Sequence, residues 1–432
     1  MTSLAGTMSA YWRMVRHNRN FRRLWFAQII SEMGDWFYAV AIYSLLLEFT
    51  GKASSVALAL VLQVLPQTFI GPMAGVINDR LSRKKVMIAA DLFRAVIVGS
   101  MLLVRSRSMI WMVYPLLFLE TIMWAFFKPG RNSALPNIVS REDLTVANTL
   151  SSTTWSFNFA VGSLLGGIVA AFIGRDAVFV INALSFIGSA LLLGGMRFRE
   201  SHLEAHGPLR LKELVDYTPI LEGVRYIKSD LRLLAMTLVK GGVGIAGANW
   251  VLLPIMGETI FRLQRPGLSA SRAGMLSMSF MMGARGVGAL MGPILIASWA
   301  GQSQRRLRHL ILMGYIAAAI GYSLLGMAPG LWLACAAVMF AHMGGSSIWV
   351  CSTTLLQMNT EDRFRGRVFS ADLGFAMLMM AITCYSTGFI IDSGISARTA
   401  AILVGVALVP ATALWLFALG LWRERAQAQA VS

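Results

Sequence analysis

Long apolar stretches alternate with short polar segments along the whole chain. Each stretch holds about 20 residues or more, which is the length that an α-helix needs to cross a bilayer. Twelve such stretches are present, at residues 24–48, 55–77, 86–104, 109–128, 151–173, 177–196, 232–256, 271–298, 308–327, 331–352, 370–391 and 399–421. The pattern therefore predicts an all-α polytopic membrane protein with twelve transmembrane helices. An even number of spans places both termini on the same side of the membrane.

The composition supports a membrane protein and argues against a nucleic-acid-binding protein. The 432 residues are 56% hydrophobic and only 14% charged, whereas soluble domains carry about 25% charged residues. A net charge of +17 would favour nucleic acid if the basic residues formed one patch, but they lie in short loops between apolar stretches. We therefore expect no nucleic-acid partner.

The sequence holds no signature of a metal site, a cofactor or an enzyme. Cys335, Cys351 and Cys384 all lie in apolar stretches without CxxC spacing, so we expect neither a disulfide framework nor a metal site. The glycine-rich runs lie inside predicted spans, and none has the spacing of a phosphate-binding loop. We expect no cofactor, no ATP-driven pump and no catalytic activity.

The basic residues predict the orientation of the chain in the membrane. Loops on the side of the N-terminus carry 26 Lys and Arg residues, and loops on the opposite side carry eight. Cytoplasmic loops are the basic ones in membrane proteins. We therefore expect a multi-pass protein of the cytoplasmic (inner) membrane with both termini in the cytoplasm.

Short patterns recur at a nearly constant distance in the two halves of the chain. Gly71-Pro72 recurs as Gly292-Pro293 at an offset of 221, and Glu142-Asp143 recurs as Glu361-Asp362 at an offset of 219. Internal repeats of this kind build transporter folds whose substrate site lies between the halves. They predict two pseudo-symmetric six-helix bundles.

The longest polar segment lies midway along the chain and divides the two predicted bundles. The first bundle is expected at residues 1–196, the linker at 197–230 and the second bundle at 231–432. Within the linker, residues 211–227 alternate apolar and polar positions with helical spacing. We expect them to form an amphipathic helix on the cytoplasmic surface.

A densely charged turn joins the second and third predicted spans. It contains Gly75, Asp79, Arg80, Arg83 and Lys84 in the order G-x-x-x-D-R-x-S-R-K. This turn resembles the loop between spans 2 and 3 of the major facilitator superfamily, with a serine in place of the second glycine. The resemblance covers nearly the whole chain and implies a transporter that works by alternating access.

The same resemblance implies a latch that holds the cytoplasmic side closed. In that superfamily the turn packs against the start of span 11, where a carboxylate meets free backbone N–H groups and the positive end of the helix dipole. Asp91 and Arg94 lie three residues apart on one face of the third span, a spacing that allows them to pair. We expect the latch to comprise Gly75, Asp79, Arg80, Arg83, Lys84, Asp91, Arg94, Arg365 and Arg367. The alternative is a solvated basic loop that only sets the topology.

Further patterns are similar to the branch that includes enterobactin exporters, macrolide efflux proteins and lysophospholipid transporters. They are Gly34-Asp35, Phe127 with Pro129, Ala134 with Pro136, Ala147-Asn148 and Arg365 with Arg367. The run from Gly162 to Gly167 is similar to an antiporter signature, with Ser163 in place of its proline. This departure weakens the inference of antiport.

Ionisable side chains inside the predicted spans are the candidate transport residues. A charge at the bilayer centre costs at least about 2.5–3.5 kcal/mol, so it usually has a function or a buried partner. Spans 1, 4, 7 and 10 line the cavity in this superfamily. The proton and substrate candidates are Glu32, Asp35, Glu120, Lys240, Arg285 and His342. For each charged candidate the alternative is a structural pair between helices, and for His342 we favour a packing role.

These features together predict a secondary active transporter. We expect it to export an amphipathic organic small molecule, such as a siderophore, a macrolide or a drug-like compound, by proton-coupled alternating access. Asp35, with Glu32 or Glu120, would carry the proton. The alternative is a lysophospholipid flippase without proton coupling, and a remote alternative is a non-transporting membrane scaffold or receptor. The expected partners are the substrate, protons and the lipid bilayer, and we expect a monomer.

Overall fold

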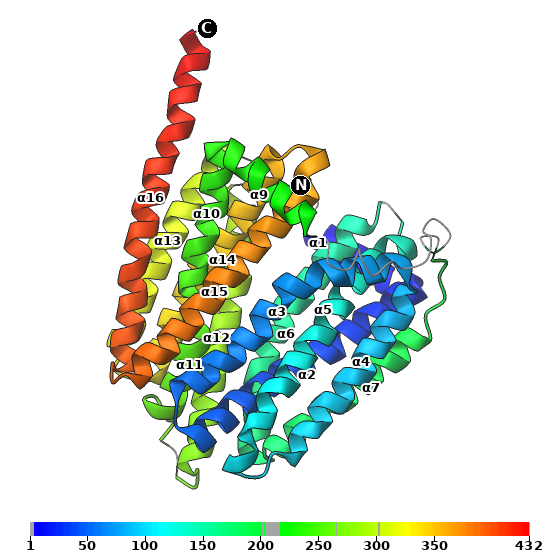
Figure 1. Cartoon of the computed structure of the whole chain (residues 1–432), viewed down its shortest axis with the longest axis vertical. Helices are drawn as coiled ribbons and strands as arrows, with labels where there is room; N and C mark the ends of the chain where they lie inside the picture. Colours follow the sequence, from blue (N-terminus) through cyan, green and yellow to red (C-terminus); the bar gives the residue numbers. More distant parts are fainter. Residues whose placement is uncertain are drawn as a thin grey trace. The chain divides into compact units, whose positions relative to one another are not determined.

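The computed structural model describes residues 4–140, 142–200, 203, 217–264, 266–300 and 303–431. Every regular element within these ranges is a helix, and Figure 1 labels them along the chain. The α-helices are α1 (Leu4–His17), α2 (Arg19–Thr50), α3 (Ala53–Arg80), α4 (Arg83–Ser100), α5 (Val113–Ile138), α6 (Leu144–Phe172), α7 (Arg175–Gly194), α9 (Thr218–Ser229), α10 (Leu231–Ala246), α11 (Asn249–Thr259), α12 (Ala270–Trp299), α13 (Gln304–Met327), α14 (Leu331–Asn359), α15 (Arg365–Asp392) and α16 (Ala397–Val431). Short 3-10 helices lie at Met101–Leu103, Arg107–Met112 and Asp362–Phe364.

Eleven helical stretches within the described residues are long and apolar enough to cross a membrane. They overlap eleven of the twelve predicted spans, with α10 and α11 together forming one of them. The remaining predicted span, 24–48, lies in the 32-residue helix α2. This helix is long enough, but Gln28, Glu32 and Asp35 make its middle polar. The structure thus has eleven candidate spans, and the number twelve stays a prediction.

The chain divides into two compact units, which are described separately below. Unit 1 comprises Met1–Leu45 and Phe69–Asp216, and unit 2 comprises Leu46–Thr68 and Tyr217–Ser432. Helix α3 therefore contributes its first part to unit 2 and its second part to unit 1. The predicted division into six-helix bundles at 1–196 and 231–432 stays a prediction. The first part of the predicted surface helix, residues 211–216, lies outside the described residues, and the rest of it falls largely in α9.

Close backbone approach between α2 and α6 fixes part of unit 1. A Cβ atom added at Gly166 of α6 would lie 2.5 Å from Cα of Phe37 and 3.2 Å from its carbonyl oxygen. Glycine at such a contact lets two membrane helices pack backbone against backbone. The obstacle is main chain rather than a flexible side chain, so a larger residue cannot be accommodated by a rotamer change.

Gly166→Ala is expected to destabilise the protein by about 1–3 kcal/mol, because an overpacked contact pushes the two backbones apart. The measurement is the thermal unfolding midpoint of the purified protein in detergent. Gly99→Ala in α4 is the matched control, since an added Cβ there meets no atom within 4 Å. Equal midpoints for the two variants would contradict this packing argument.

In unit 2 a carboxylate caps the N-terminal end of α3. Asp392, the last residue of α15, accepts hydrogen bonds from the backbone N–H groups of Ala53 (2.7 Å) and Ser54 (3.0 Å). Those groups have no partner inside their own helix, and the helix dipole favours a negative charge there. This is the type of contact that the sequence predicted for Asp79 and the start of α15, but here α15 supplies the carboxylate and α3 receives it.

Candidate functional site

Arg94 lies at the centre of a buried group of charges in unit 1. Its side chain is only 1% exposed, and its Nη2 atom donates to both carboxylate oxygens of Asp35, at 2.9 and 2.7 Å. Its Nε atom donates to Oε1 of Glu120 at 2.8 Å. The guanidinium also lies over the ring of Phe186, 4.0 Å from the centroid. Helices α2, α4, α5 and α7 thus each contribute one side chain to this site.

Asp91 adds a third carboxylate to the same group. It lies one turn before Arg94 on α4, with Oδ1 3.7 Å from Nη1 of Arg94, and it is fully buried. Neither of its oxygens accepts a hydrogen bond within the described residues. Three carboxylates therefore surround one guanidinium. We expected Asp91 and Arg94 to belong to the cytoplasmic latch, but the structure places them with Asp35 and Glu120.

Glu32 lies one turn before Asp35 but has a different partner. Its Oε1 atom accepts from Nη1 of Arg131 at 2.9 Å, and Oε2 accepts from Gln28 at 3.1 Å and Asn158 at 3.4 Å. The charge of Glu32 is therefore balanced by an arginine of its own. These contacts favour the alternative given for it, a pair that joins α2 and α5.

The charged turn after α3 is held mainly by contacts within unit 1. Asp79 is more than half exposed, and among the described residues it accepts a long contact from Nη2 of Arg83, at 3.4 Å. Arg83 also donates from Nη1 to the carbonyl oxygen of Ser133 at 2.8 Å, which ties the turn to α5. Gly75 and Arg80 lie on the last turns of α3, and a Cβ added at Gly75 meets no atom within 4 Å.

Ser82 has a structural role that the resemblance did not imply. It is the N-cap of α4, and its hydroxyl accepts from the backbone N–H of Lys85 at 3.3 Å, as serine commonly does at this position. The hydroxyl donates to Glu200 at 2.5 Å, whose carboxylate also accepts from the N–H of Lys84 at 3.3 Å. The Lys84 ammonium donates to the carbonyl oxygen of Met196 at 2.7 Å. The end of α7 and the following chain therefore fasten this turn.

The start of α15, where the latch was predicted to dock, contacts α9 within unit 2. Arg367 forms an ion pair with Glu222, with Nη1 2.8 Å from Oε2. The ring of Tyr226 stacks on that of Phe364 at 4.3 Å. Arg365 is the first residue of α15. The charged turn belongs to unit 1 and α15 to unit 2, so the latch itself stays a prediction.

Unit 2 contains a second buried pair that the sequence did not predict. Lys240 of α10 is 1% exposed, and its Nζ lies 3.6 Å from Oδ2 of Asp372 on α15. The same ammonium donates to the Thr353 hydroxyl at 2.8 Å and lies 3.7 Å from the ring centroid of Trp349. Lys240 was a candidate, whereas Asp372 was not.

Arg285 and His342 lie together beside the break between α10 and α11. The Arg285 Nε atom donates to Nε2 of His342 at 2.8 Å, and its guanidinium lies 3.5 Å from the ring centroid of Trp250, just after the break. An acceptor at Nε2 requires a neutral imidazole with its hydrogen on Nδ1. This contact supports the packing role that we favoured for His342. No group of three or more metal-ligating side chains was found in the described part of the chain.

The chain from residue 10 to residue 430 matches the family model described as transmembrane secretion effector, a group within the major facilitator superfamily. The chain belongs to this family. It is 26% identical over 374 residues to macrolide efflux protein A of Streptococcus pyogenes, which covers 84% of this chain and 87% of that protein. It is 29% identical over 217 residues to the uncharacterised transporter YfiS of the same superfamily from Bacillus subtilis, covering 50% of this chain.

Solved structures of other transporters share the fold of this family member. A peptide-bound crystal structure of a POT family transporter has a TM-score of 0.70 at 13% identity, covering 94% of this chain and 96% of that chain. The nucleoside transporter NupG has a TM-score of 0.69 at 10% identity, covering 92% and 98%. With sequence identities this low, the matches show that the fold is shared, and they say nothing about the substrate. Family membership and the macrolide efflux relatives make this chain a membrane transporter with an efflux role.

Proposed function

We propose that this transporter exports an amphipathic organic molecule in exchange for protons. The proton site comprises the carboxylates of Asp35, Asp91 and Glu120 around Arg94. The observation that carries the proposal is their ratio, three carboxylates to one guanidinium, with Asp91 and Glu120 buried and the Asp35 side chain 25% exposed. If all four groups were ionised, the group would have a net charge of −2 in a low-dielectric interior.

An uncompensated charge is costly away from water, and a buried carboxylate can relieve that cost by taking up a proton. The three carboxylates compete for the guanidinium of Arg94, which holds Asp35 and Glu120 at hydrogen-bond distance and Asp91 only at 3.7 Å. A proton that binds one carboxylate neutralises it and weakens its contact with Arg94. The guanidinium can then move toward another carboxylate of the group. Proton binding is thereby linked to a rearrangement of contacts between α2, α4 and α5, which alternating access requires.

The proposal of an amphipathic substrate is supported by aromatic side chains that lie next to the charged group. Trp36 follows Asp35 on α2, and its ring lies 4.3 Å from that of Phe159 and 5.8 Å from that of Trp155 on α6. Trp155 is exposed. Apolar and aromatic side chains beside a few charges are typical of sites for organic ligands. The name of the Streptococcus relative, macrolide efflux protein A, agrees with a ligand of this class.

The test is transport of a macrolide panel into everted membrane vesicles with an imposed proton gradient. Wild-type uptake is expected to stop when a protonophore collapses the gradient. Asp35→Asn is expected to lower gradient-driven uptake by at least about tenfold, a typical size for the loss of coupling between two ligands. Asp176→Asn is the matched control, because Asp176 is an exposed residue of α7 that pairs with exposed Arg105.

Two results would overturn the proposal. Uptake that survives the protonophore would exclude proton coupling and favour the lysophospholipid flippase. The same vesicles should then take up lysophosphatidylethanolamine offered in place of the macrolide. Equal uptake by Asp35→Asn and Asp176→Asn at equal protein levels would remove the charge group from the mechanism.

A further inference from the structure

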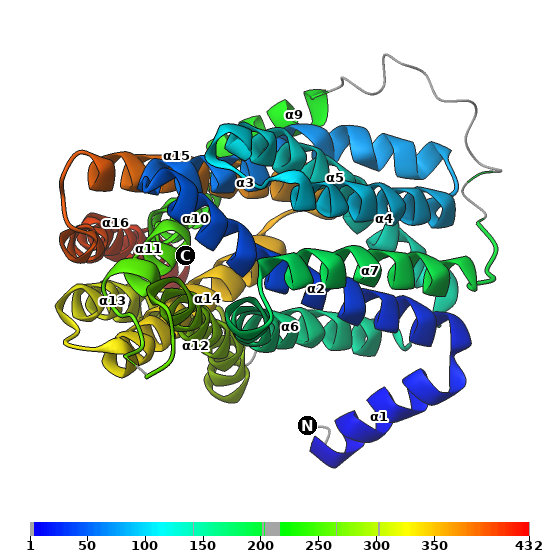
Figure 2. The ribbon, with the colours of Figure 1, turned by 90° about the horizontal axis from the view of Figure 1, so that it is seen from below.

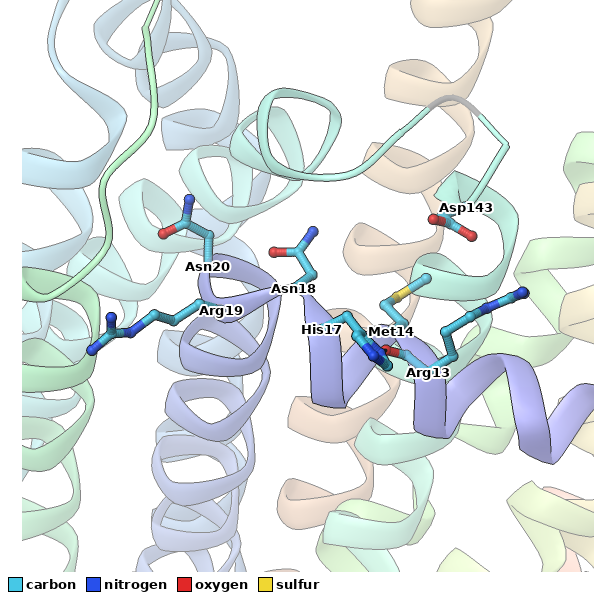
Figure 3. Close-up of a pocket in the computed structure, with 7 residues that line it drawn as sticks. All are labelled: Arg13, Met14, His17, Asn18, Arg19, Asn20 and Asp143. Atoms are coloured by element: carbon cyan, nitrogen blue, oxygen red, sulfur yellow. The ribbon is translucent and has the colours of Figure 1, made fainter.

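We propose that α1 and the corner between α1 and α2 form a binding site for the phosphate headgroup of an anionic phospholipid. This site is separate from the proposed proton site and does not depend on it. Its residues line a hollow of about 530 Å³, drawn in Figure 3. They are Arg13, Met14, His17, Asn18, Arg19, Asn20 and Asp143.

One side of α1 is anchored in the core of unit 1 and the other side is open. Met14 is 5% exposed and belongs to the apolar core near the start of α2. Elsewhere on the same helix Arg13, Arg16 and His17 are exposed, and Trp12 is 67% exposed. Figure 2 shows α1 turning back from the start of α2. A tryptophan beside arginines on a helix surface is the composition of segments that lie in the headgroup layer of a membrane.

The wall of the hollow is held by side chains that are already hydrogen-bonded. Asn18 donates to the carbonyl oxygen of Ile138 at 2.6 Å and accepts from the N–H of Phe21 at 2.9 Å. Asn20 donates to the carbonyl oxygen of Arg197 at 2.7 Å and accepts from the N–H of the same residue at 3.0 Å. These bonds fix the corner between α1 and α2 against the ends of α5 and α7. The hollow is therefore formed before any ligand arrives.

The ligand-binding groups are the two guanidiniums on either side of this fixed wall. Figure 3 shows Arg13 and Arg19 on opposite sides of Asn18. Neither forms an ion pair among the residues that the structure describes. Asp143 is the one carboxylate lining the hollow, and it accepts from the Ser140 hydroxyl at 3.0 Å. Two arginines against one carboxylate leave a net positive charge, which suits a phosphate.

The position of the hollow favours a lipid over a soluble anion. It lies where the polar N-terminal segment meets α2, the helix that contains the first predicted span. Clusters of arginine directly outside a membrane helix attract anionic lipid headgroups in the cytoplasmic leaflet. The exposed ring of Trp12 lies on the same short helix and can enter the headgroup layer, which a site for free phosphate does not require.

The experiment measures lipid binding to the full chain by native mass spectrometry after titration with phosphatidylglycerol, phosphatidylcholine or inorganic phosphate. We expect phosphatidylglycerol to bind, and Arg13→Gln/Arg19→Gln to weaken that binding by about tenfold or more, because both charges near the headgroup are lost. The control is Arg305→Gln/Arg306→Gln, which removes two exposed arginines at the start of α13. It should leave binding unchanged.

Three outcomes would overturn the proposal. Equal weakening by both double variants would indicate attraction to basic charge in general. Equal binding of phosphatidylcholine would exclude recognition of an anionic headgroup. Inorganic phosphate that displaces phosphatidylglycerol equally from the wild type and from Trp12→Ala would indicate a soluble-anion site. If the double variant is poorly produced, Arg13→Gln alone keeps the test possible, because that side chain is exposed and outside the core.

Discussion

Replacing Arg94 with glutamine is expected to abolish transport and to destabilise the protein. The change removes the positive charge that Asp35, Asp91 and Glu120 share, while the carboxylates of Asp91 and Glu120 stay buried. Removing one member of a buried ion pair typically costs about 3–5 kcal/mol, because the remaining charge has no compensation. The measurements are proton-driven efflux in vesicles and the thermal unfolding midpoint in detergent, at matched protein levels.

Three variants separate the roles of charge and geometry at Arg94. Arg94→Lys keeps the charge but lacks the planar fork of donors that Arg94 presents to Asp35 and Glu120, so it should fold better than Arg94→Gln and still transport poorly. Arg94→Gln/Asp35→Asn/Glu120→Gln should regain stability without regaining transport. Arg105→Gln, which breaks an exposed pair with Asp176, should change stability by less than about 1 kcal/mol. Normal transport by well-inserted Arg94→Gln would contradict a central role for this residue.

Lys240→Met is expected to have the second largest effect, through the buried pair in unit 2. It leaves the carboxylate of Asp372 buried without its ammonium, and Oδ1 of that residue already lacks a hydrogen-bond partner within the described residues. The loss should again reach about 3–5 kcal/mol. The thermal unfolding midpoint gives the stability, and vesicle efflux gives the transport rate.

A double-mutant cycle with Asp372→Asn tests the pair directly. If the 3.6 Å contact is the source of the effect, Lys240→Met/Asp372→Asn should be more stable than Lys240→Met alone, with a coupling energy of about 0.5–3 kcal/mol. Additive losses would mean that the two residues act separately. In that case the contacts of Lys240 with Thr353 and Trp349 would account for its burial.

The apolar pattern identified most of the helices but not the contacts between them. It located eleven stretches that the structure also has as candidate spans, because the length of an apolar run reflects the thickness of a bilayer. It also selected Asp35 and Glu120 as deep charges. It could not pair them, since Arg94 lies 59 and 26 positions away from these residues and meets them only through the packing of three helices.

The sequence alone did not predict the surroundings of two acidic residues, Asp91 and Asp372. Asp91 was assigned to the latch together with Arg94, three positions later, yet it is buried with Arg94 in the proposed proton site. Asp372 stands two positions after the start of a predicted span, and such residues normally reach the headgroups. Its burial against Lys240 follows from the packing of α15 on α10. The position of a residue along a predicted span is therefore a poor guide to the burial of its side chain near the ends of that span.

Helix α3 must supply flexibility if the two units move during transport. The change from unit 2 to unit 1 falls between Thr68 and Phe69, and Pro66 and Pro72 lie on either side of it. Each proline removes a backbone hydrogen bond and weakens the helix locally. The two prolines therefore weaken α3 close to the point where this helix passes from unit 2 to unit 1.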